Sequence, residues 1–563
     1  MPILYTKNYK DFELHDENTN TVLHSFTGAK LASRVLPGDK VKQKQKQKQS
    51  EAEAGCELIE RKNHPILVGL IELNSKTKYG FTSRNVPIYL FVPFNESYPP
   101  FVVGCSERDT SKNRLALIRF DSWTETFPRG NLQRLLPEGA DEEALFWNYT
   151  PLACEKYKGE LPPLPQYTER PIIKAFHIDP SGCRDVDDVM TIEHTDSDTF
   201  ITITISDVAI NIPQDHPLDL RARQIAQTFY QGGSKSSESS ESSEPKHVFP
   251  KELSEDRLSL LPSSEPRYGV SLRFGLKNPS KTEWFNSLVQ TTETYTYESV
   301  YENHPICKTL TKMATALQEP TEDSHKWIEV AMKFYNMEAA KLLHKFKTGI
   351  LRSHSEPDKE KLTNLLKINP DLQFLAFKSA EYVESVSENL YHYGLQTNLY
   401  CHATSPIRRY ADLVNQRSIK AIISNLPIPQ QIATIANLNC VAKQAKRHNR
   451  DLTFIRALKR QQSQTQGQIV EIKIDSDKIK LSIYIPEWET IVKSWCKKGA
   501  ADNMVMSKDE KSELKVIVGD QIQIKYFADM SARSWKKRMV IRPVLTVLTD
   551  LTDLTDLTDS ENV

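Results

Sequence analysis

Short stretches in which apolar and polar residues alternate dominate residues 63 to about 165. The clearest are Ile66–Leu73, Val86–Val92 and Leu115–Phe120, and residues such as Asn, Ser, Gly and Pro separate them. A period of two places the apolar side chains on one face of a strand, and the intervening residue types favour turns. The pattern therefore predicts an all-β unit. A second all-β unit is predicted from residue 466 to about 546 by the stretches Gln468–Ile474, Lys480–Pro486 and Gln521–Tyr526.

The region between these two units has a mixed pattern. Ile172–Ile178 is an apolar run of the length expected for a buried strand. Further along, Ser405 is a good N-cap and Pro406 suits the first position of a helix, so we expect a helix to begin there. The residues that then share one helical face are Ile407, Tyr410, Ala411 and Val414.

The length of 563 residues exceeds what one core supports and predicts about three or four domains. The proline-rich segment Leu161–Gln166 is typical of a stiff linker. Gly232–Glu244 contains little besides Ser, Glu and Gly, and it predicts a disordered surface loop. The closing Leu-Thr-Asp repeat has no core-forming pattern, so residues 547–563 are expected to be a tail.

The overall charge is balanced, with 73 basic and 73 acidic residues, and gives no support for nucleic-acid binding. Any basic surface must therefore be a local arrangement. The chain has no apolar run of about eighteen residues that could cross a membrane, and its N-terminus lacks the features of a signal or transit peptide. Eight cysteines without a Cys-x-x-Cys pair favour a reducing, cytoplasmic location.

Four carboxylates, those of Asp179, Asp185, Asp187 and Asp188, lie within ten residues. We expect Asp179 at the end of a strand and the other three in the loop beyond it. Ionised carboxylates about 4 Å apart repel by about 4 kcal/mol at an effective dielectric constant of about 20. Such a cluster needs a cation or protons, and ligands that are all oxygen suit Mg²⁺ or Mn²⁺. The alternative is a solvated acidic turn.

Arg408 is expected in the first turn of the helix that begins at Ser405. Free backbone N–H groups and the positive end of the helix dipole make that position suitable for a phosphate. The alternative is that Arg408 pairs with Asp412 one turn further on.

Together, Asp179–Asp188 and Tyr400–Leu413 resemble the catalytic domain of the ribonuclease II family, which includes ribonuclease II, ribonuclease R and the Dis3 exoribonucleases. Members carry an Ile-Asp-Pro…Arg-Asp-x-Asp-Asp segment and then a His-x-Thr-Ser-Pro-Ile-Arg-Arg-Tyr-x-Asp-Leu segment. The resemblance covers about residues 168–465. Further matching blocks lie between the two segments, at Thr228–Gly233, Val248–Glu255, Thr296–Val300, Ile328–Met332 and His392–Leu395.

The resemblance implies a multidomain α+β protein with a mixed α/β RNB catalytic domain at residues 166–465, flanked by small OB-fold β-barrels. Residues 1–62 then correspond to a first cold-shock-like domain, residues 63–165 to a second, and residues 466–546 to an S1-like domain. No endonuclease-type domain is expected before them, which argues against a full exosome-type Dis3. Exposed aromatic side chains of such barrels stack on RNA bases. The candidates in the second barrel are Tyr79, Phe81, Tyr89 and Phe91.

The activity that the resemblance implies is processive 3′-to-5′ hydrolysis of single-stranded RNA to 5′-mononucleotides, by a two-metal mechanism with Mg²⁺, or alternatively Mn²⁺. Asp179, Asp185 and Asp188 then ligate metal. Asp187 serves the second metal or the attacking water and matters most for catalysis. Arg408 holds the scissile phosphate, and Arg409 is expected to be structural.

The resemblance also places Tyr230 and Tyr297 at the 3′ end of the RNA and Glu329 near the terminal nucleotide. The alternative for both tyrosines is half-buried packing. Gln416 departs from the family, whose members usually have His at that position. We expect a monomer that binds single-stranded RNA and no membrane, whereas membership of a larger RNA-decay complex cannot be deduced.

Two other functions stay open. A catalytically inactive RNA-binding scaffold would be marked by loss of an acidic ligand, but all four are present. A metal-dependent deoxyribonuclease is disfavoured by the family resemblance alone, because recognition of the 2′-hydroxyl group cannot be deduced from these residues.

Overall fold

The computed structural model describes residues 1–17, 21–44, 55–165, 169–230, 244–430, 435–460, 463–501, 503–506, 513–529, 532 and 535–544. Most of the predicted loop at 232–244 and the whole predicted tail at 547–563 lie outside these residues. The chain divides into two compact units. The first comprises residues 1–148, 358–376 and 448–563, and the second comprises residues 149–357 and 377–447. Within the described ranges, no helix is long and apolar enough to span a membrane.

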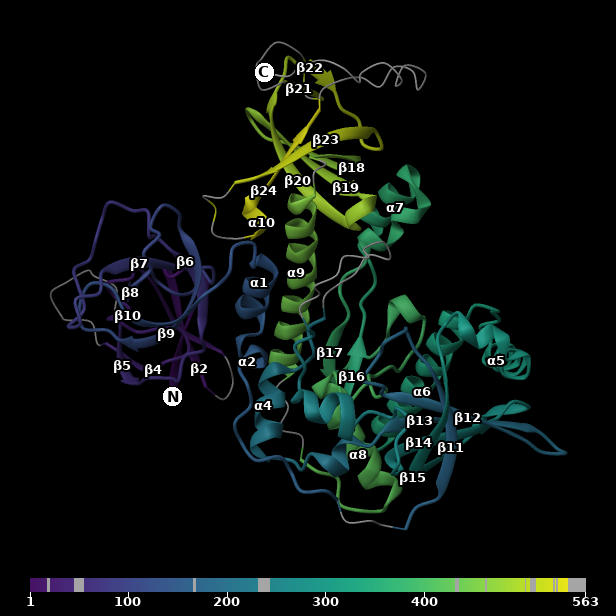
Figure 1. Ribbon diagram of the computed structural model, residues 1–563. Helices are drawn as coiled ribbons and strands as arrows, with labels where there is room; N and C mark the ends of the chain where they lie inside the picture. Colours follow the sequence, from purple (N-terminus) through teal and green to yellow (C-terminus); the bar gives the residue numbers. More distant parts are fainter. Residues whose placement is uncertain are drawn as a thin grey trace. The chain divides into compact units, whose positions relative to one another are not determined.

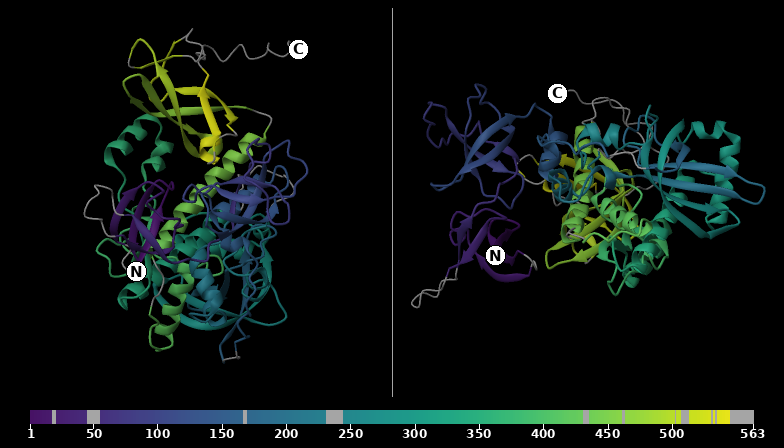
Figure 2. Two further views of the ribbon diagram at one scale, coloured as in Figure 1. Left: turned by 90° about the vertical axis from the view of Figure 1, so that its left-hand side faces the viewer. Right: turned by 90° about the horizontal axis from the view of Figure 1, so that it is seen from below.

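The described part of the first unit contains three sheets, drawn in purple, blue and yellow-green (Figures 1 and 2). The three sheets repeat one strand order. In the N-terminal sheet and the middle barrel, the strands numbered along the chain lie in the order third, second, first, fourth, fifth. The C-terminal sheet has the same order once the hairpin of β21 and β22, which lies beside its third strand, is left out. In the middle sheet the fifth strand also pairs in parallel with the third, which closes a barrel. This is the connectivity of the five-stranded OB fold.

The N-terminal sheet consists of β1 (Pro2–Thr6), β2 (Asp11–Asp16), β3 (Val22–Thr27), β4 (Lys40–Gln43) and β5 (Cys56–Glu60). The middle barrel consists of β6 (Leu67–Ile71), β7 (Ile88–Pro93), β8 (Phe101–Gly104), β9 (Arg114–Ser122) and β10 (Arg129–Leu135). The C-terminal sheet consists of β18 (Gln464–Ile474), β19 (Lys478–Ile485), β20 (Thr490–Lys498), β21 (Met504–Met506), β22 (Glu513–Lys515), β23 (Gln521–Ala528) and β24 (Met539–Pro543). Helical segments of this unit are α7 (Lys359–Ile368), η3 (Pro370–Ala376), η5 (Pro486–Trp488) and α10 (Trp535–Arg538), and α1 (Asp141–Tyr149) lies at its boundary.

The second unit is built on a closed five-stranded barrel in which each strand pairs with the next along the chain. The barrel closes because its first strand also pairs in parallel with its last, from Ile172 opposite Leu288 to Ile178 opposite Tyr295. The carboxyl ends of these two strands therefore lie at the same end of the barrel. The strands are β11 (Ile172–Ile178), β12 (Asp188–His194), β13 (Thr199–Ser206), β14 (Arg267–Gly275) and β15 (Asn278–Tyr295).

Alternation along β13 explains how helices pack on this barrel. Ile201, Ile203 and Ile205 join a core that includes residues of α5 and α6, whereas the hydroxyl of the intervening Thr204 lies 2.7 Å from that of Ser271. The longer helices are α4 (Pro217–Ile225), α5 (His304–Ala316), α6 (Ser324–Lys345), α8 (Tyr410–Ile423) and α9 (Ile435–Lys459), the last of which continues into the first unit. Shorter elements are α2 (Pro151–Cys154), α3 (Val208–Asn211), η1 (Leu253–Arg257), η2 (Ser299–Glu302), β16 (Ile350–Ser353), β17 (Glu381–Glu384) and η4 (Tyr393–Leu395).

The predicted α+β class is confirmed, but two local predictions are wrong. The helix expected at Ser405 begins at Tyr410, because Ser405 opens a turn in which the N–H groups of Arg408 and Arg409 both donate to its carbonyl oxygen. In addition, Asp188 is the first residue of β12, where it pairs with Ile205, so only Asp185 and Asp187 lie in the loop.

Acid is expected to destabilise both units. His448 of the first unit and His392 of the second are buried, and burial lowers the pKa of each to about 4. Because an unfolded histidine titrates near about 6.5, the unfolded chain binds protons that the folded chain does not. The free energy of unfolding is therefore at its full value above about pH 6.5. It decreases as the pH falls toward about 4, by at most roughly 3 kcal/mol per residue. Urea unfolding across this range tests the prediction, and His392→Gln should flatten the pH dependence of the second unit. An unchanged slope would contradict it.

Candidate active site

The parallel pairing of β11 and β15 forms one side of the site. Asp179 directly follows β11, and its N–H donates to the carbonyl oxygen of Tyr295 at the end of β15 (3.1 Å). Tyr297, two residues further on, is therefore held at the same end of the barrel. The Asp179 Oδ2 atom lies 2.9 Å from Nδ1 of His177.

A tight turn carries the chain from Asp179 to the other carboxylates. The N–H of Cys183 donates to the carbonyl oxygen of Pro180, and Gly182 has φ of +79°, as the third residue of a type II turn requires. Beyond the turn, the N–H of Ser206 donates to the carbonyl oxygen of Asp187 (2.8 Å). The carboxylate loop is thus fixed to the end of β13.

The aspartate side chains at this end of the barrel influence one another electrostatically. Burial raises the pKa of Asp187 well above its usual range and the charges of Asp185 and Asp188 add to this effect, whereas Arg408 and the Ile407 N–H oppose it. Burial, and then the charge of Asp179, raises the pKa of Asp188 to about 7. The barrel end therefore concentrates negative charge in a place that solvent reaches poorly.

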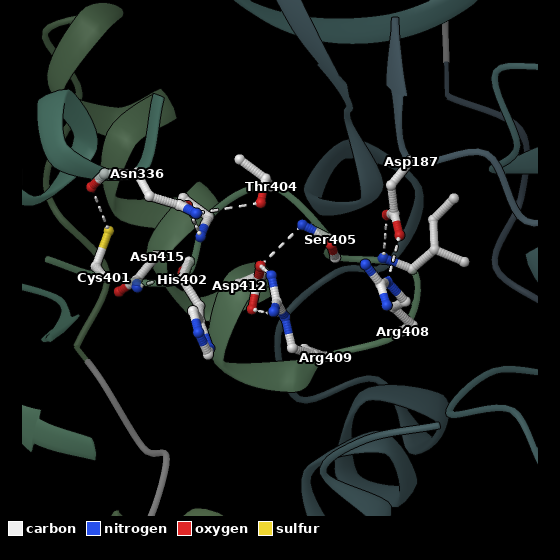
Figure 3. Close-up of polar contacts among 12 residues, drawn as sticks. Asp187, Asn336, Cys401, His402, Thr404, Ser405, Arg408, Arg409, Asp412 and Asn415 are labelled. Carbon is white, nitrogen blue, oxygen red and sulfur yellow. Dashed lines mark hydrogen bonds and ion pairs between the residues drawn. The ribbon is translucent and has the colours of Figure 1, made fainter. Parts of the chain in front are cut away.

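Arg408 approaches the cluster from the segment before α8 (Figure 3). Its Nε atom lies 3.5 Å from Oδ2 of Asp187, and the N–H of Ile407 donates to Oδ1 of Asp187 (2.9 Å). The Arg408 side chain is 47% exposed, so it can reach a bound phosphate as well as Asp187. The alternative pairing of Arg408 with Asp412 is wrong, because Arg409 occupies that carboxylate through two hydrogen bonds.

Buried polar side chains hold the Arg408 segment in place (Figure 3). Asp412 accepts a hydrogen bond from the N–H of Ser405, and the amide oxygen of Asn336 accepts one from the N–H of Ala403 (both 2.8 Å). Asn415 donates to the carbonyl oxygen of His402 (2.9 Å). These contacts replace the helical turn that the Ser-Pro pair predicts.

The two predicted RNA-contacting tyrosines both lie at the carboxylate cluster. The hydroxyl of Tyr230 donates to Oδ2 of Asp185 (2.6 Å). Tyr297 stacks on His325 with ring centroids 3.9 Å apart, and burial followed by the charges of Asp179 and Asp188 raises the pKa of Tyr297 to about 12.

Glu329 is not brought into the cluster. It is exposed on α6, and no contact among the described residues connects it with the aspartates or Arg408. Its predicted role near the terminal nucleotide stays a prediction.

The cluster fits a cation without forming a closed cage. Within the described part of the chain, no three His, Cys, Asp or Glu side chains are arranged to hold a metal ion by themselves. However, Oδ2 of Asp187 is buried and has no hydrogen-bond partner among the described residues. A set of carboxylates in which one buried oxygen lacks a hydrogen bond suits an ion that keeps water and substrate oxygens as its other ligands.

Several supporting residues were not found from the sequence. Asn336 and Asn415 have no motif, because they act through backbone groups distant in the sequence. Gln416, the departure from the family pattern, is buried and binds the Ser206 carbonyl oxygen (2.7 Å) and the Ala209 N–H (3.0 Å), so it stabilises the chain after β13. His247 lies beside Asp185, with its Nδ1 atom 4.0 Å from Oδ2.

Comparisons with known proteins agree with this geometry. The RNB domain model matches residues 171–304 and 302–425, which contain the carboxylate cluster and Arg408. Ribonuclease R of Chlamydia pneumoniae is 26% identical over 318 residues, which cover 43% of this chain and 45% of that protein. The chain thus matches about half the length of that relative.

Two solved structures share the fold. The complex of Mycoplasma genitalium RNase R with ribose-methylated single-stranded RNA matches with a TM-score of 0.66 and 16% identity, over 96% of this chain and all of the other. Yeast Ssd1, described as a pseudonuclease, matches with a TM-score of 0.59 and 15% identity, over 93% of this chain and 81% of the other. Fold and site together define a multidomain protein with an RNB domain and OB-fold flanks. Residues 171–425 of the chain thus form an RNB domain similar to that of Ribonuclease R proteins.

Proposed function

We propose that this protein is a 3′-to-5′ exoribonuclease that degrades single-stranded RNA processively to 5′-mononucleotides. The observation that supports this most strongly is the convergence of Asp179, Asp185, Asp187 and Asp188 with Arg408 at one end of the barrel. Proteins similar to this chain include Ribonuclease R proteins, whose name identifies them as ribonucleases.

The residues present divide the work of phosphodiester hydrolysis. The four aspartates would hold two divalent ions, which would supply a water of lowered pKa and stabilise the leaving 3′-oxygen. Asp187 accepts a hydrogen bond from the Ile407 N–H and forms an ion pair with Arg408, and these contacts hold Arg408 beside the cluster. Arg408 stabilises the charge that grows on the scissile phosphate. Tyr297 and its stacked partner His325 offer an aromatic surface beside the cluster for the terminal nucleotide.

The flanking OB-type sheets offer surfaces for a single strand. Of the four aromatic candidates in the middle barrel, Tyr89 and Phe91 are buried, whereas Phe81 is 62% exposed. The C-terminal sheet exposes Trp495, with the ammonium group of Lys480 5.2 Å from its ring centroid. Exposed rings next to cations are typical of sequence-tolerant single-strand binding.

The cofactor we propose is Mg²⁺, with Mn²⁺ as the alternative, because oxygen ligands predominate in the cluster. We further propose a monomer that acts in the cytoplasm.

The decisive experiment compares linear and circular RNAs of the same sequence, with Mg²⁺ or with EDTA. The linear RNA, labelled at either end, should shorten from its 3′ end, and the circle should survive. Binding should weaken as salt rises, because phosphate contacts exchange with counterions. Rapid cleavage of the circle would show endonucleolytic attack and would contradict the proposal.

The same assay distinguishes the proposed exoribonuclease from the main alternative, an RNA-binding scaffold without catalytic activity. The structural match to the pseudonuclease Ssd1 concerns the fold alone. A scaffold would bind the linear RNA and leave it intact with either Mg²⁺ or Mn²⁺. A matched DNA strand, degraded equally well, would instead indicate a deoxyribonuclease.

Tyr230→Phe is expected to lower kcat about tenfold or more, with little change in RNA affinity. The hydroxyl of Tyr230 orients Asp185 through a 2.6 Å hydrogen bond, and a hydrogen bond to a charged group contributes about 1.5–3 kcal/mol. The ring face that could stack on a base is unchanged in phenylalanine. Single-turnover hydrolysis and equilibrium binding measure the two effects. A variant with wild-type kcat would show that Tyr230 acts by stacking alone.

A further inference from the structure

His247 lies at the edge of the carboxylate cluster in an environment that two acidic side chains define. Its Nε2 atom lies 3.2 Å from Oε1 of Glu255, and its Nδ1 atom lies 4.0 Å from Oδ2 of Asp185. The His247 side chain is only 8% exposed. Neither the sequence motifs nor the proposed mechanism gives this residue a role.

The hydrogen bond with Glu255 determines which nitrogen is free. A carboxylate only accepts hydrogen bonds, so Nε2 carries a proton. In the neutral ring, Nδ1 then has a lone pair directed away from Glu255. An imidazole that donates one N–H to a carboxylate and presents its other nitrogen is the usual arrangement of a metal-binding histidine.

A second, independent observation concerns Nδ1 itself. This atom is buried and makes no hydrogen bond with any of the described residues. A buried polar atom without a partner costs free energy. The space between Nδ1 of His247 and Asp185 is therefore suited to a ligand that Nδ1 can bind. Asp185 is itself oriented toward this space by the hydroxyl of Tyr230.

We propose that His247 is a nitrogen ligand of a divalent transition-metal ion that it shares with Asp185. A 4.0 Å separation must shorten by about 1 Å to match two neighbouring positions of an octahedral ion with bonds of about 2.1 Å. Water and substrate oxygens complete the coordination. Because imidazole suits transition metals and Mg²⁺ prefers oxygen, the site favours Mn²⁺ over Mg²⁺. The inference rests on the proposed placement of metal at the cluster and specifies its ligands and selectivity.

Direct titration of the full-length, metal-free protein with Mn²⁺ tests the inference, with free Mn²⁺ measured by its electron paramagnetic resonance signal. Mg²⁺ affinity is measured by competition. His247→Gln can keep an N–H near Glu255 and removes the Nδ1 ligand. Glu255→Gln keeps the imidazole and removes the carboxylate that fixes its tautomer. His194→Gln, an exposed histidine at the far end of β12, is the control.

We expect His247→Gln and Glu255→Gln each to weaken Mn²⁺ binding by about 10–100-fold. Mg²⁺ binding should change by less than about threefold, and the control should match the wild type. His247→Asn, which can place an oxygen near the Nδ1 position, should recover part of the Mn²⁺ affinity lost in His247→Gln. Unchanged Mn²⁺ affinity, or equal losses for Mn²⁺ and Mg²⁺, would overturn the inference.

The binding measurement is independent of RNA hydrolysis. If the wild type degrades RNA and the His247 variants bind Mn²⁺ normally, the inference fails and the proposed function stands. If Mn²⁺ binding depends on His247 but no RNA is degraded, the metal ligand stands and the proposed function fails.

Discussion

Replacing Asp187 with asparagine is expected to abolish RNA hydrolysis and to leave RNA binding near its wild-type level. The carboxylate lies between the Ile407 N–H and Arg408, and its buried Oδ2 atom faces the Arg408 guanidinium at 3.5 Å without a hydrogen bond. Loss of its charge affects the transition state more than the ground state, so kcat should fall by at least about 100-fold. Parallel degradation and filter-binding assays measure the two effects. More than about a tenth of the activity, a cost of only about 1.4 kcal/mol, would contradict the assignment.

Loss of folding cannot explain this expected result. Asparagine keeps an oxygen that accepts a hydrogen bond from the Ile407 N–H. It also removes a buried carboxyl group, whose charged form is disfavoured because burial raises its pKa. Arg408 loses a partner, but its side chain is half exposed and can be hydrated. The melting temperature of Asp187→Asn should therefore equal or exceed that of the wild type. Asp196→Asn, an exposed substitution after β12, is the matched control and should retain full activity.

Local sequence patterns predicted the parts of the site that local interactions form. Asp179 follows its strand as expected, because the apolar run Ile172–Ile178 is long enough to become β11. Apolar stretches likewise predicted three of the five strands of the middle barrel, β6, β7 and β9, but not β8 or β10. The four aspartates were found together because they are close in the sequence.

Contacts between distant segments decided the rest. Ser405 and Pro406 favour a helix start, but the adjoining N–H groups bind Asp412 and Asp187 instead, so α8 begins later. No periodicity could reveal these bonds. His247 could not be connected with Asp185 either, because the barrel and not the chain places them side by side.

Replacing Asp412 with alanine is expected to destabilise the second unit by about 3–5 kcal/mol and to reduce hydrolysis. Asp412 is fully buried and accepts hydrogen bonds from the Ser405 N–H and from Nε and Nη2 of Arg409, at 2.8, 2.9 and 2.8 Å. Its loss leaves the Arg409 guanidinium without a counter-charge and releases the segment that carries Arg408. Urea unfolding measures the stability, and hydrogen exchange in α8 locates the change.

A double variant separates the lost ion pair from simple loss of packing. Arg409→Met combined with Asp412→Ala removes both charges, so it should be more stable than Asp412→Ala alone, because no unpaired charge is buried. Its activity should stay low, since Ser405 still lacks its acceptor and Arg408 is no longer held opposite Asp187. Lys341→Ala, which removes the exposed lysine of an ion pair with Glu338 on α6, should cost less than about 1 kcal/mol. If the single and double variants are equally unstable, the buried pair is not what holds the Arg408 segment against the carboxylate cluster.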